Sequence, residues 1–361
     1  MKVLFVTRKY PPSVGGMENL SYHLIAEMRR RVEVNAIAWG GSQKLLPLFL
    51  LYALAKSIWI GRLGVDLVHL GDSVIALIGW VLKRLFRVPV VVAVHGLDIT
   101  FPSLFYQWLT PRLVREFDSI VCNSNATRDA CIARGIPDFK CTVIHPGVLI
   151  PTVLSPREAS RDWLAQALGK DLQSTSVLLT VGRLVPRKGV VWFVESVLPQ
   201  VVAARPGTCY VVIGSGPEEH ALRSAAARSA VKGQVYLLGR VPPDELPLVY
   251  TAADLFIMPN VPCPGDMEGF GLVALEAAAH GLPVLAADLE GIRDAVVPGQ
   301  TGRLLPAGNA SPWVEGVLDL LRHSSGLQSL GRQARATVQV HYTWSHMADE
   351  HEKLFRQVLK A

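Results

Sequence analysis

Short apolar runs alternate with longer amphipathic segments through the first half of the chain. Met17–Arg31 carries Leu20, Leu24 and Met28 at helical spacing, which predicts a helix with one buried face. Short apolar runs separated by helices are typical of a doubly wound parallel sheet. The strands predicted in this half are Lys2–Thr7, Val32–Ala38, Asp66–Leu70, Pro89–Val94, Ser119–Asn123 and Thr142–Ile144.

The second half repeats this alternation after a change of domain that we expect within Pro151–Gln173. A chain of 361 residues is too long for one compact core, so two parallel α/β domains with a ligand cleft between them are predicted. The predicted strands are Val177–Val181, Tyr210–Ile213, Val235–Leu238, Ala253–Pro259, Pro283–Ala286 and Thr301–Leu305. The predicted helices are Val190–Val202, Leu246–Ala252, Pro312–Leu321, Leu327–His341 and Ser345–Leu359.

Two segments of the first half have compositions that could contact a membrane or a lipid, and the first of them, Leu45–Ile60, is apolar on nearly every side. Leu45–Ile60 ends near Trp59, and Trp80–Arg87 mixes aromatic and aliphatic residues with three cations. The favoured interpretation is a pair of buried helices that cover the sheet. The alternative is an interfacial surface or a groove for a lipid acceptor. Neither segment reaches the length needed to span a bilayer.

Charge is distributed unevenly between the two halves. The whole chain carries a formal net charge of +6, whereas residues up to Ile150 hold 17 Lys and Arg against 10 Asp and Glu, a net of +7. Chance solvated cations explain this excess, and so does a face for anionic lipid or an acidic acceptor. No nucleic-acid-binding motif accompanies the charge, so nucleic acid is not expected as a partner.

The cysteines and the N-terminus indicate a cytoplasmic protein. Five cysteines have no paired spacing, which suits a reducing compartment and argues against a disulfide framework or a zinc site. The apolar part of the N-terminal segment is too short for a signal peptide.

Candidate ligand contacts in the first half follow strands that end at one edge of the predicted sheet, where doubly wound folds bind ligands. Gly15 and Gly16 follow the first strand and precede a helix. His95 opens a His-Gly-Leu-Asp turn after Pro89–Val94, and Ser124-Asn125 follows another strand. Each of these also has a purely structural interpretation as a turn.

The second half carries glycine turns accompanied by basic residues. Gly182 and Arg183 follow the strand Val177–Val181, and Lys188 lies five positions after Arg183. Both cations could reach one diphosphate at the mouth of the sheet. Gly214 and Gly216 form a second turn after the strand Tyr210–Ile213.

The stretch from Pro259 to Gly281 combines a strand end, a glycine turn and a helix. Glu268 precedes Gly269, Phe270 and Gly271, and the helix that follows carries Glu276. Glycines let backbone N–H groups approach a ligand, and the helix N-terminus favours an anion. Because carboxylates can bind the hydroxyls around that anion, the stretch suits a sugar nucleotide.

These motifs together resemble the retaining glycosyltransferases of family 4, which have the GT-B fold, and in particular bacterial mannosyl- and glucosyltransferases. The resemblance covers nearly the whole second half and is looser in the first half, through Gly15-Gly16 and His95-Gly96. It implies an α/β fold of two doubly wound Rossmann-like domains. Residues 1–152 plus 345–361 would bind the acceptor, with the last helix crossing back, and residues 153–344 would bind the donor.

The resemblance also implies roles by position. Glu268 would bind sugar hydroxyls, Glu276 the ribose, and Arg183 and Lys188 the diphosphate leaving group, while His95 would lie beside the anomeric centre. The remaining predicted donor contacts are glycines and backbone N–H groups, at Gly15, Gly16, Gly182, Gly214, Gly216, Gly269, Phe270, Gly271 and Leu272. The chain departs from the family in Glu290–Asp294, where a Gly-Gly pair is more usual.

The predicted reaction is transfer of a hexose from a GDP- or UDP-sugar to a hydroxyl of a lipid-linked or glycan acceptor. Retention would follow from same-face attack, assisted by the leaving phosphate. The family needs no metal or other cofactor, and the chain has no Asp-x-Asp pair. The location expected is the cytoplasm, with peripheral contact to the inner face of the plasma membrane.

Three other functions are weighed against this one. A non-catalytic nucleotide-sugar-binding protein of the same fold is the main alternative. A nicotinamide oxidoreductase would need Gly-x-Gly-x-x-Gly after the first strand, whereas the loop here reads YPPSVGG. A phosphorylase of similar fold would contain pyridoxal phosphate, which colours the purified protein.

Overall fold

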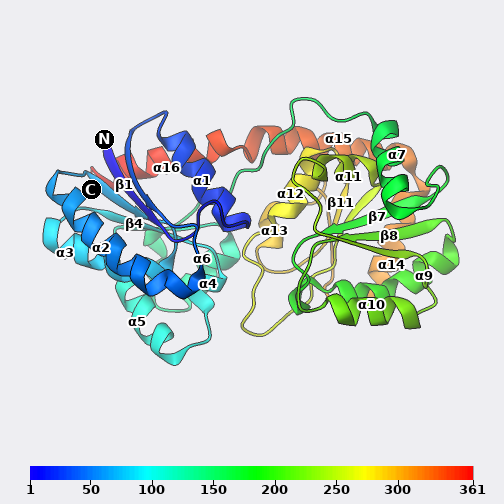
Figure 1. Cartoon of the computed structure of the whole chain (residues 1–361), viewed down its shortest axis with the longest axis horizontal. Coiled ribbons are helices and arrows are strands. Elements are labelled where there is room, and N and C mark those ends of the chain that lie inside the picture. Colours follow the sequence, from blue (N-terminus) through cyan, green and yellow to red (C-terminus); the bar gives the residue numbers. More distant parts are fainter. Residues whose placement is uncertain (361) are drawn as a thin grey trace. The chain divides into compact units, whose positions relative to one another are not determined.

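The computed structural model describes residues 1–360 and forms two compact units (Figure 1). The first unit contains Met1–Gly147, the short stretch Gly265–Phe270 and the chain from Tyr342 onward. The second contains Val148–Pro264 and Gly271–His341. The chain passes from one unit to the other at Gly147–Val148 and at His341–Tyr342, and the short stretch Gly265–Phe270 groups with the first unit.

The first unit is built on a six-stranded parallel sheet with the order β2-β1-β3-β4-β5-β6. Its strands are β1 Lys2–Thr7, β2 Glu33–Ala38, β3 Leu67–Leu70, β4 Val90–Val94, β5 Ser119–Cys122 and β6 Cys141–Val143. Its helices are α1 Gly16–Met28, α2 Leu46–Arg62, α3 Ala76–Phe86, α4 Leu97–Thr100, α5 Leu104–Val114, α6 Asn125–Ile132 and α16 Trp344–Val358, with short helical turns η1 Gln43–Leu45, η2 Ser73–Ile75 and η3 Asp138–Lys140.

Alternate residues of this sheet bury two different cores. Val68 and Leu70 of β3 point toward α2, α3 and α5, whereas Leu67 points toward α1 and α16. The alternation follows from the two-residue period of a strand. Because both faces are covered, the strands are apolar throughout, as the sequence pattern predicts.

The second unit repeats the architecture with the order β12-β11-β10-β7-β8-β9, again parallel. Its strands are β7 Ser176–Val181, β8 Thr208–Ile213, β9 Val235–Gly239, β10 Leu255–Met258, β11 Val284–Ala287 and β12 Arg303–Leu305. Its helical segments are α7 Arg157–Leu168, η4 Pro186–Lys188, α8 Val190–Trp192, η5 Phe193–Val197, α9 Leu198–Ala204, α10 Glu219–Arg228, α11 Leu246–Ala252, α12 Leu272–Ala279, α13 Ile292–Ala295, α14 Ala310–Arg322 and α15 Ser324–His341.

The structure confirms each predicted strand, and the doubly wound α/β class with it. One helix differs from its prediction, because Val190–Val202 is not continuous α-helix. Phe193–Val197 is a π-helical turn in which the N–H of Leu198 donates to the carbonyl of Phe193. Pro199 has no N–H to continue the α-helical pattern, which accounts for the wider turn just before it.

Within the described residues, no helix is both long enough and apolar enough to cross a bilayer. Leu45–Ile60 corresponds to α2, which buries Phe49, Ala53 and Ile60 against the sheet. The favoured interpretation of this segment as a sheet-covering helix is therefore confirmed for one of its faces.

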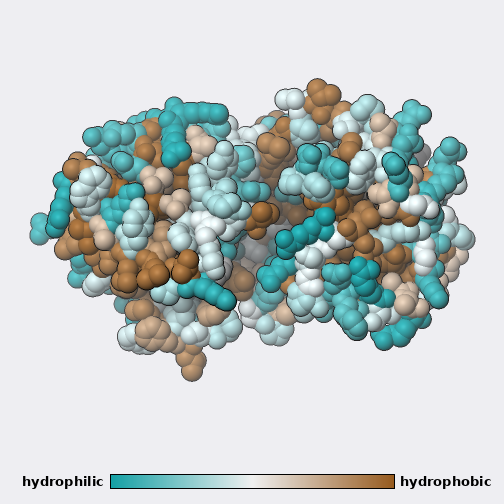
Figure 2. All heavy atoms as spheres, in the orientation of Figure 1, coloured by the Kyte–Doolittle hydropathy of each residue, from teal (hydrophilic) through white to brown (hydrophobic). Residues whose placement is uncertain are grey.

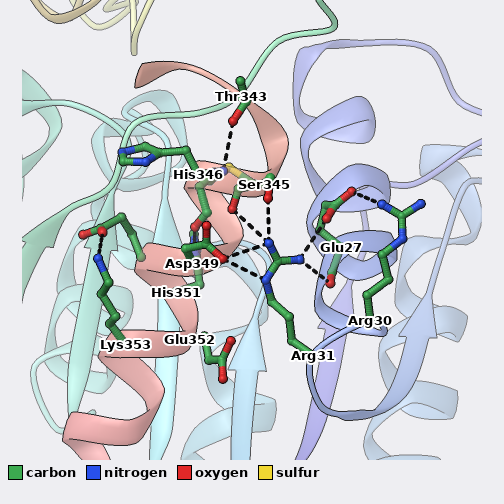
Figure 3. A network of polar contacts seen from close by, with 12 residues as sticks. Glu27, Arg30, Arg31, Thr343, Ser345, His346, Asp349, His351, Glu352 and Lys353 are labelled. Carbon is green, nitrogen blue, oxygen red and sulfur yellow. Dashed lines mark hydrogen bonds and ion pairs between the residues drawn. The ribbon is translucent and has the colours of Figure 1, made fainter. Parts of the chain in front are cut away.

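The last helix, α16, belongs to the first unit and is joined to α1 by a polar network (Figure 3). Arg31 donates to Glu27 at 2.8 Å, to Asp349 at 2.8 Å and to the hydroxyl of Ser345 at 2.8 Å. Thr343 caps the helix by accepting from the N–H of His346 at 3.0 Å. Below these contacts α16 buries its apolar face in the core shared with α1.

Arg31 provides a test of this anchoring. We expect Arg31→Met to lower the free energy of unfolding by about 1–2 kcal/mol, because charge-assisted hydrogen bonds on both helices are lost. The matched control is Arg30→Met, because the Arg30 side chain is 73% exposed and pairs with Glu27, three positions before it in the chain. The control should change stability by less than about 0.5 kcal/mol in urea denaturation. Equal losses in both variants would contradict the anchoring role.

Candidate active site

In the second unit, two glycine turns lie in direct backbone contact at the carboxyl ends of β7 and β8. A side chain on Gly214 would overlap the carbonyl oxygen of Gly182, and one on Gly216 would overlap that of Leu184. The N–H of Gly182 donates to Ile213 at 2.9 Å. Both Gly182, with φ 154°, and Gly214, with φ 132°, adopt backbone conformations that other residues rarely adopt. The predicted glycines therefore hold the two loops together.

The basic loop after β7 is held against the segment that follows β10. A side chain on Gly189 would overlap the carbonyl oxygen of Pro259, and the N–H of Val261 donates to the backbone carbonyl oxygen of Arg187 at 3.0 Å. Lys188 is half-buried in this loop, whereas Arg183 is exposed. The structure thus places Lys188 beside the end of β10, from which the chain continues toward α12.

Helix α12 begins directly after Gly271, whose φ of 98° is left-handed. Among the described residues, no side chain caps this helix N-terminus. The first N–H groups of α12, starting at Leu272, are consequently suited to an anion, as the sequence predicts. Gly271 itself lies against Met258 at the end of β10.

Glu276 lies on α12 in a mostly apolar environment. Burial raises the pKa of its carboxyl above the usual range, and the Tyr250 hydroxyl and the charge of Lys188 oppose that shift. Tyr250 donates to Glu276 Oε2 at 3.0 Å. The charge of Lys188 thus bears on the Glu276 carboxyl, and both predicted residues belong to the second unit.

In the first unit, the Glu268–Gly269 turn packs on the carboxyl ends of β4 and β5. A side chain on Gly269 would overlap the His95 carbonyl oxygen, and a side chain on Gly96 would come within 3.2 Å of Gly269 Cα. The Asn123 amide also lies beside Gly269. Glu268 is buried next to Gly269, in a turn that lies against the His95 carbonyl and the Asn123 amide.

Phe270 is buried at the end of this turn, with 3% of its surface exposed. Its ring stacks on His145 at a centroid distance of 5.5 Å, and His145 also stacks on Tyr342 at 5.8 Å. The side chain therefore anchors the turn. The predicted ligand contact at Phe270 concerns its backbone N–H alone.

His95 is oriented by its own loop. Its backbone N–H donates to Asp98 Oδ1 at 2.8 Å, and its Nε2 lies 2.9 Å from the carbonyl oxygen of Gly71. A carbonyl only accepts, so the neutral ring carries its proton on Nε2 and has Nδ1 as its acceptor. Asp98 in turn accepts from both the N–H and the hydroxyl of Ser73, at 3.1 and 3.0 Å.

Gly15 and Gly16 begin α1 beside a polar hollow of about 280 Å³. A side chain on Gly15 would overlap the carboxylate of Glu18, which pairs with Lys9 at 3.1 Å. Further lining comes from Arg8, which pairs with the buried Asp72 at 3.1 Å. The first predicted glycine turn is thus next to a hollow that contains both signs of charge.

The structure also identifies positioning residues that the sequence analysis did not single out. Asp98 is part of the His-Gly-Leu-Asp turn in the sequence, but only the folded structure shows that its carboxylate holds His95. Asn123, which directly precedes the predicted Ser124-Asn125 pair, contacts Gly269 of the Glu268 turn. Tyr250 lies 26 residues before Glu276, and no local motif links the two.

One loop keeps an unusual backbone despite its departure from the family pattern. Glu290, after β11, has φ 45°, in the left-handed region that glycine adopts most easily. Glu290 therefore adopts this conformation at a position where the resemblance leads us to expect glycine. Among the described residues, His, Cys, Asp and Glu form no group of three or more suited to a metal ion.

Comparison with known proteins follows the two-unit organisation. A family model described as Glycosyltransferase Family 4 matches residues 14–149, and one described as Glycosyl transferases group 1 matches residues 175–323. The chain belongs to glycosyltransferase family 4. Family membership agrees with the resemblance drawn from the sequence motifs.

Two curated relatives are similar to this glycosyltransferase along nearly its whole length, and a third along most of it. It is 26% identical to the GDP-mannose-dependent alpha-(1-6)-phosphatidylinositol monomannoside mannosyltransferase of Mycolicibacterium smegmatis, over 95% of each chain. It is 28% identical to the GDP-mannose-dependent monoacylated alpha-(1-6)-phosphatidylinositol monomannoside mannosyltransferase of Corynebacterium glutamicum, over 96% of each chain. It is 30% identical to the D-inositol 3-phosphate glycosyltransferase of Nocardia farcinica, over 79% of this chain and 64% of the relative.

Solved structures show the GT-B fold. HepE of Anabaena in complex with UDP-glucose superposes with a TM-score of 0.78 at 22% identity, covering 99% of this chain and all of HepE. Sucrose-phosphate synthase of Thermosynechococcus elongatus superposes with a TM-score of 0.79 at 19% identity, covering 99% of each chain.

The shifted pKa of Glu276 leads to a prediction for stability. The folded state binds this proton more tightly than the unfolded state, whose pKa is near the usual 4.5. The stability that protonation contributes is therefore complete below about pH 4.5 and is lost as pH rises through the higher folded pKa. We expect Glu276→Gln, which cannot ionise, to remove this decline and to be more stable than wild type at pH 7.

Urea denaturation across pH 4 to 8 measures the effect. Tyr250→Phe is the complementary variant, because loss of the hydroxyl removes a contact that lowers the Glu276 pKa. Tyr250→Phe should therefore show a larger decline of stability with rising pH than wild type does. If Glu276→Gln shows the wild-type pH profile, the proposed environment of this carboxyl is wrong.

Proposed function

We propose that this glycosyltransferase transfers a hexosyl group from a nucleotide-diphosphate sugar to a hydroxyl of a lipid-linked or glycan acceptor, with retention of anomeric configuration. The observation that carries the proposal lies in the second unit. Two interlocked glycine turns, Lys188, the uncapped start of α12 and Glu276 occur together at the carboxyl ends of parallel strands. Sheets of this kind bind nucleotides at that edge.

The diphosphate leaving group would bind where positive charge gathers. Breaking the anomeric C–O bond leaves the shared electron pair on the β-phosphate, so negative charge develops there. Lys188, Arg183 and the N–H groups at the start of α12 would stabilise that charge. The exposure of Arg183 suits a side chain that closes on the phosphates after the donor has bound.

The carboxylates would bind hydroxyls. Glu276, held by Tyr250, would accept from the ribose hydroxyls, and Glu268 would accept from those of the transferred hexose. His95 would accept a hydroxyl hydrogen bond at Nδ1, because its Nε2–H is engaged by Gly71. In this arrangement Glu268 binds the sugar and does not attack it.

Retention would follow from attack on the face that the phosphate leaves. The acceptor oxygen forms its bond to the anomeric carbon as the C–O bond to the β-phosphate breaks. The acceptor proton passes to a departing phosphate oxygen, which completes the exchange without a covalent enzyme intermediate. Charge on the phosphate is met by protein groups, so the proposal includes neither a metal nor another cofactor.

The donor proposed first is GDP-mannose, with UDP-glucose as the second choice. The full-length relatives named above are GDP-mannose-dependent mannosyltransferases that act on phosphatidylinositol mannosides. A mannosylated phosphatidylinositol is consequently the first acceptor to test.

Substitution of Lys188 and Glu268 tests the function. With GDP-mannose and phosphatidylinositol monomannoside, we expect Lys188→Ala and Glu268→Gln each to lower kcat/KM about a hundredfold or more, because each loses a transition-state contact. Arg303→Ala is the control, since Arg303 on β12 pairs with Asp319 on α14 and has no part in the proposed chemistry. It should retain wild-type activity. NMR of the product should show the anomeric configuration of the donor.

Donor binding by thermal shift separates this function from its main alternative. Binding of a nucleotide sugar without transfer to any mannosylated lipid or glycan would favour a non-catalytic binder. Full activity in either Lys188→Ala or Glu268→Gln would exclude the proposed site.

A further inference from the structure

Helix α2 of the first unit is apolar on both of its faces. Its inner face buries Phe49, Ala53 and Ile60 in the core beneath the sheet. Its outer face exposes Leu48 by 63%, Leu51 by 67%, Tyr52 by 54% and Trp59 by 59%. A surface helix of a soluble domain normally has polar residues on the outer side, so this face is unusual.

Helix α16 in the same unit shows the ordinary arrangement. It buries Met347 and Phe355 in the core, and its outer side carries Glu350, Lys353 and other charged residues in ion pairs. The apolar outer face of α2 is therefore not a general property of this fold unit.

A second exposed apolar segment begins α5 and precedes it. Phe101 is exposed by 50%, Leu104 by 93%, Phe105 by 69% and Trp108 by 55%. Helix α3, which packs against both α2 and α5, adds exposed Leu77 and Leu85. Because α2, α3 and α5 cover the same face of the sheet, their outer sides form one layer surface.

We call this layer surface the α2–α5 surface and define it by its exposed apolar residues: Leu45, Leu48, Leu51, Tyr52, Trp59, Leu63, Leu77, Leu85, Leu97, Phe101, Leu104, Phe105 and Trp108. They are 13 of the 21 exposed large apolar residues in the described chain. Figure 2 shows apolar atoms gathered over α2 and at the tip near the start of α5. Such a concentration marks an interaction surface rather than scattered exposure.

Positive charge accompanies the apolar residues. No Asp or Glu occurs between Glu33 and Asp66, a stretch that contains Lys44, Lys56 and Arg62. Likewise none occurs between Asp98 and Glu116, where Arg112 and Arg115 lie.

Two of these cations lie over aromatic rings of the same surface. Lys56 Nζ is 5.4 Å from the centre of the Tyr52 ring, and the Arg112 guanidinium is 5.1 Å from that of Trp108. The two cations of α3 are instead paired, Lys83 with Asp118 and Arg84 with Glu116. The charge available to a partner therefore belongs mainly to α2 and α5.

We infer that the α2–α5 surface docks on an anionic lipid bilayer. Exposed Trp and Tyr beside cations and aliphatic side chains match the boundary between acyl chains and anionic headgroups. A second copy of the chain is disfavoured as the occupant, because a symmetric dimer would oppose cations with cations. No described helix is long and apolar enough to cross a bilayer, so the contact that we propose is a surface one.

This inference goes beyond the transfer reaction and does not depend on it. Docking would place the first unit next to lipid-linked hydroxyls. It needs only the outer residues of α2, α3 and α5, none of which has a part in the proposed chemistry.

Vesicle co-sedimentation of the full chain tests the inference. We expect binding to vesicles of phosphatidylcholine with one third phosphatidylglycerol, and much weaker binding to phosphatidylcholine alone. Leu51→Glu with Trp59→Glu, and separately Leu104→Glu with Phe105→Glu, should each lower the apparent affinity about tenfold or more, because apolar burial is lost and negative charge is introduced against an anionic surface. Raising salt from 0.05 to 0.5 M should weaken wild-type binding.

The matched control is Phe139→Glu, an apolar residue of the same unit that is 86% exposed and lies on η3, outside the α2–α5 surface. It should bind vesicles as wild type does. All variants change exposed positions, so their melting temperatures should stay near that of wild type. Lys44→Gln with Lys56→Gln is a milder variant. It should reduce binding to anionic vesicles and leave the weak binding to phosphatidylcholine vesicles unchanged.

Three results would overturn the inference: no binding of wild type to anionic vesicles at low salt, equal loss in Phe139→Glu, or a dimer in sedimentation that Leu51→Glu with Trp59→Glu converts to monomer without any vesicle binding. The assay contains neither donor nor acceptor, so its failure leaves the transfer reaction untouched. Conversely, if Lys188→Ala loses transfer activity but still binds vesicles, that result bears on the proposed reaction and not on membrane docking.

Discussion

Close approach of backbone to backbone at the carboxyl ends of the strands is the constraint on which the candidate site depends. Gly214 lies on the carbonyl of Gly182, and Gly269 lies on that of His95. A Cβ at either glycine would push the loops apart. In each unit, therefore, glycine allows segments that are distant in sequence to meet at one sheet edge, with polar groups left near the place where ligands bind in such folds.

The two predicted carboxylates have different surroundings, although only eight positions separate them. Glu268 is buried in a turn beside His95 and Asn123, in the first compact unit. Glu276 lies on a helix of the second unit, where burial raises its pKa and Tyr250 and Lys188 partly offset that shift. The difference in environment supports different roles, with one carboxylate proposed for the hexose and the other for the ribose.

Helix α2 shows how one element can serve both folding and association. Its inner residues, such as Phe49, complete the core beneath the sheet, so the helix would be needed even without a partner. Its outer residues, such as Trp59, contribute nothing to that core and expose apolar surface to water. That exposure costs solubility unless something covers it, which is the physical reason to connect the surface with lipid.

The sequence by itself determined the strands, the doubly wound class and the glycine turns, because apolar periodicity and glycine reflect local geometry. It also indicated Lys188, Glu268 and Glu276 through their spacing. Only the tertiary structure decided that Asp98 orients His95, that Tyr250 holds Glu276 and that Asn123 meets Gly269. It also decided that α2 is apolar on both sides of a single packed layer. Contacts between distant segments depend on how strands are ordered and helices packed, which no local pattern records.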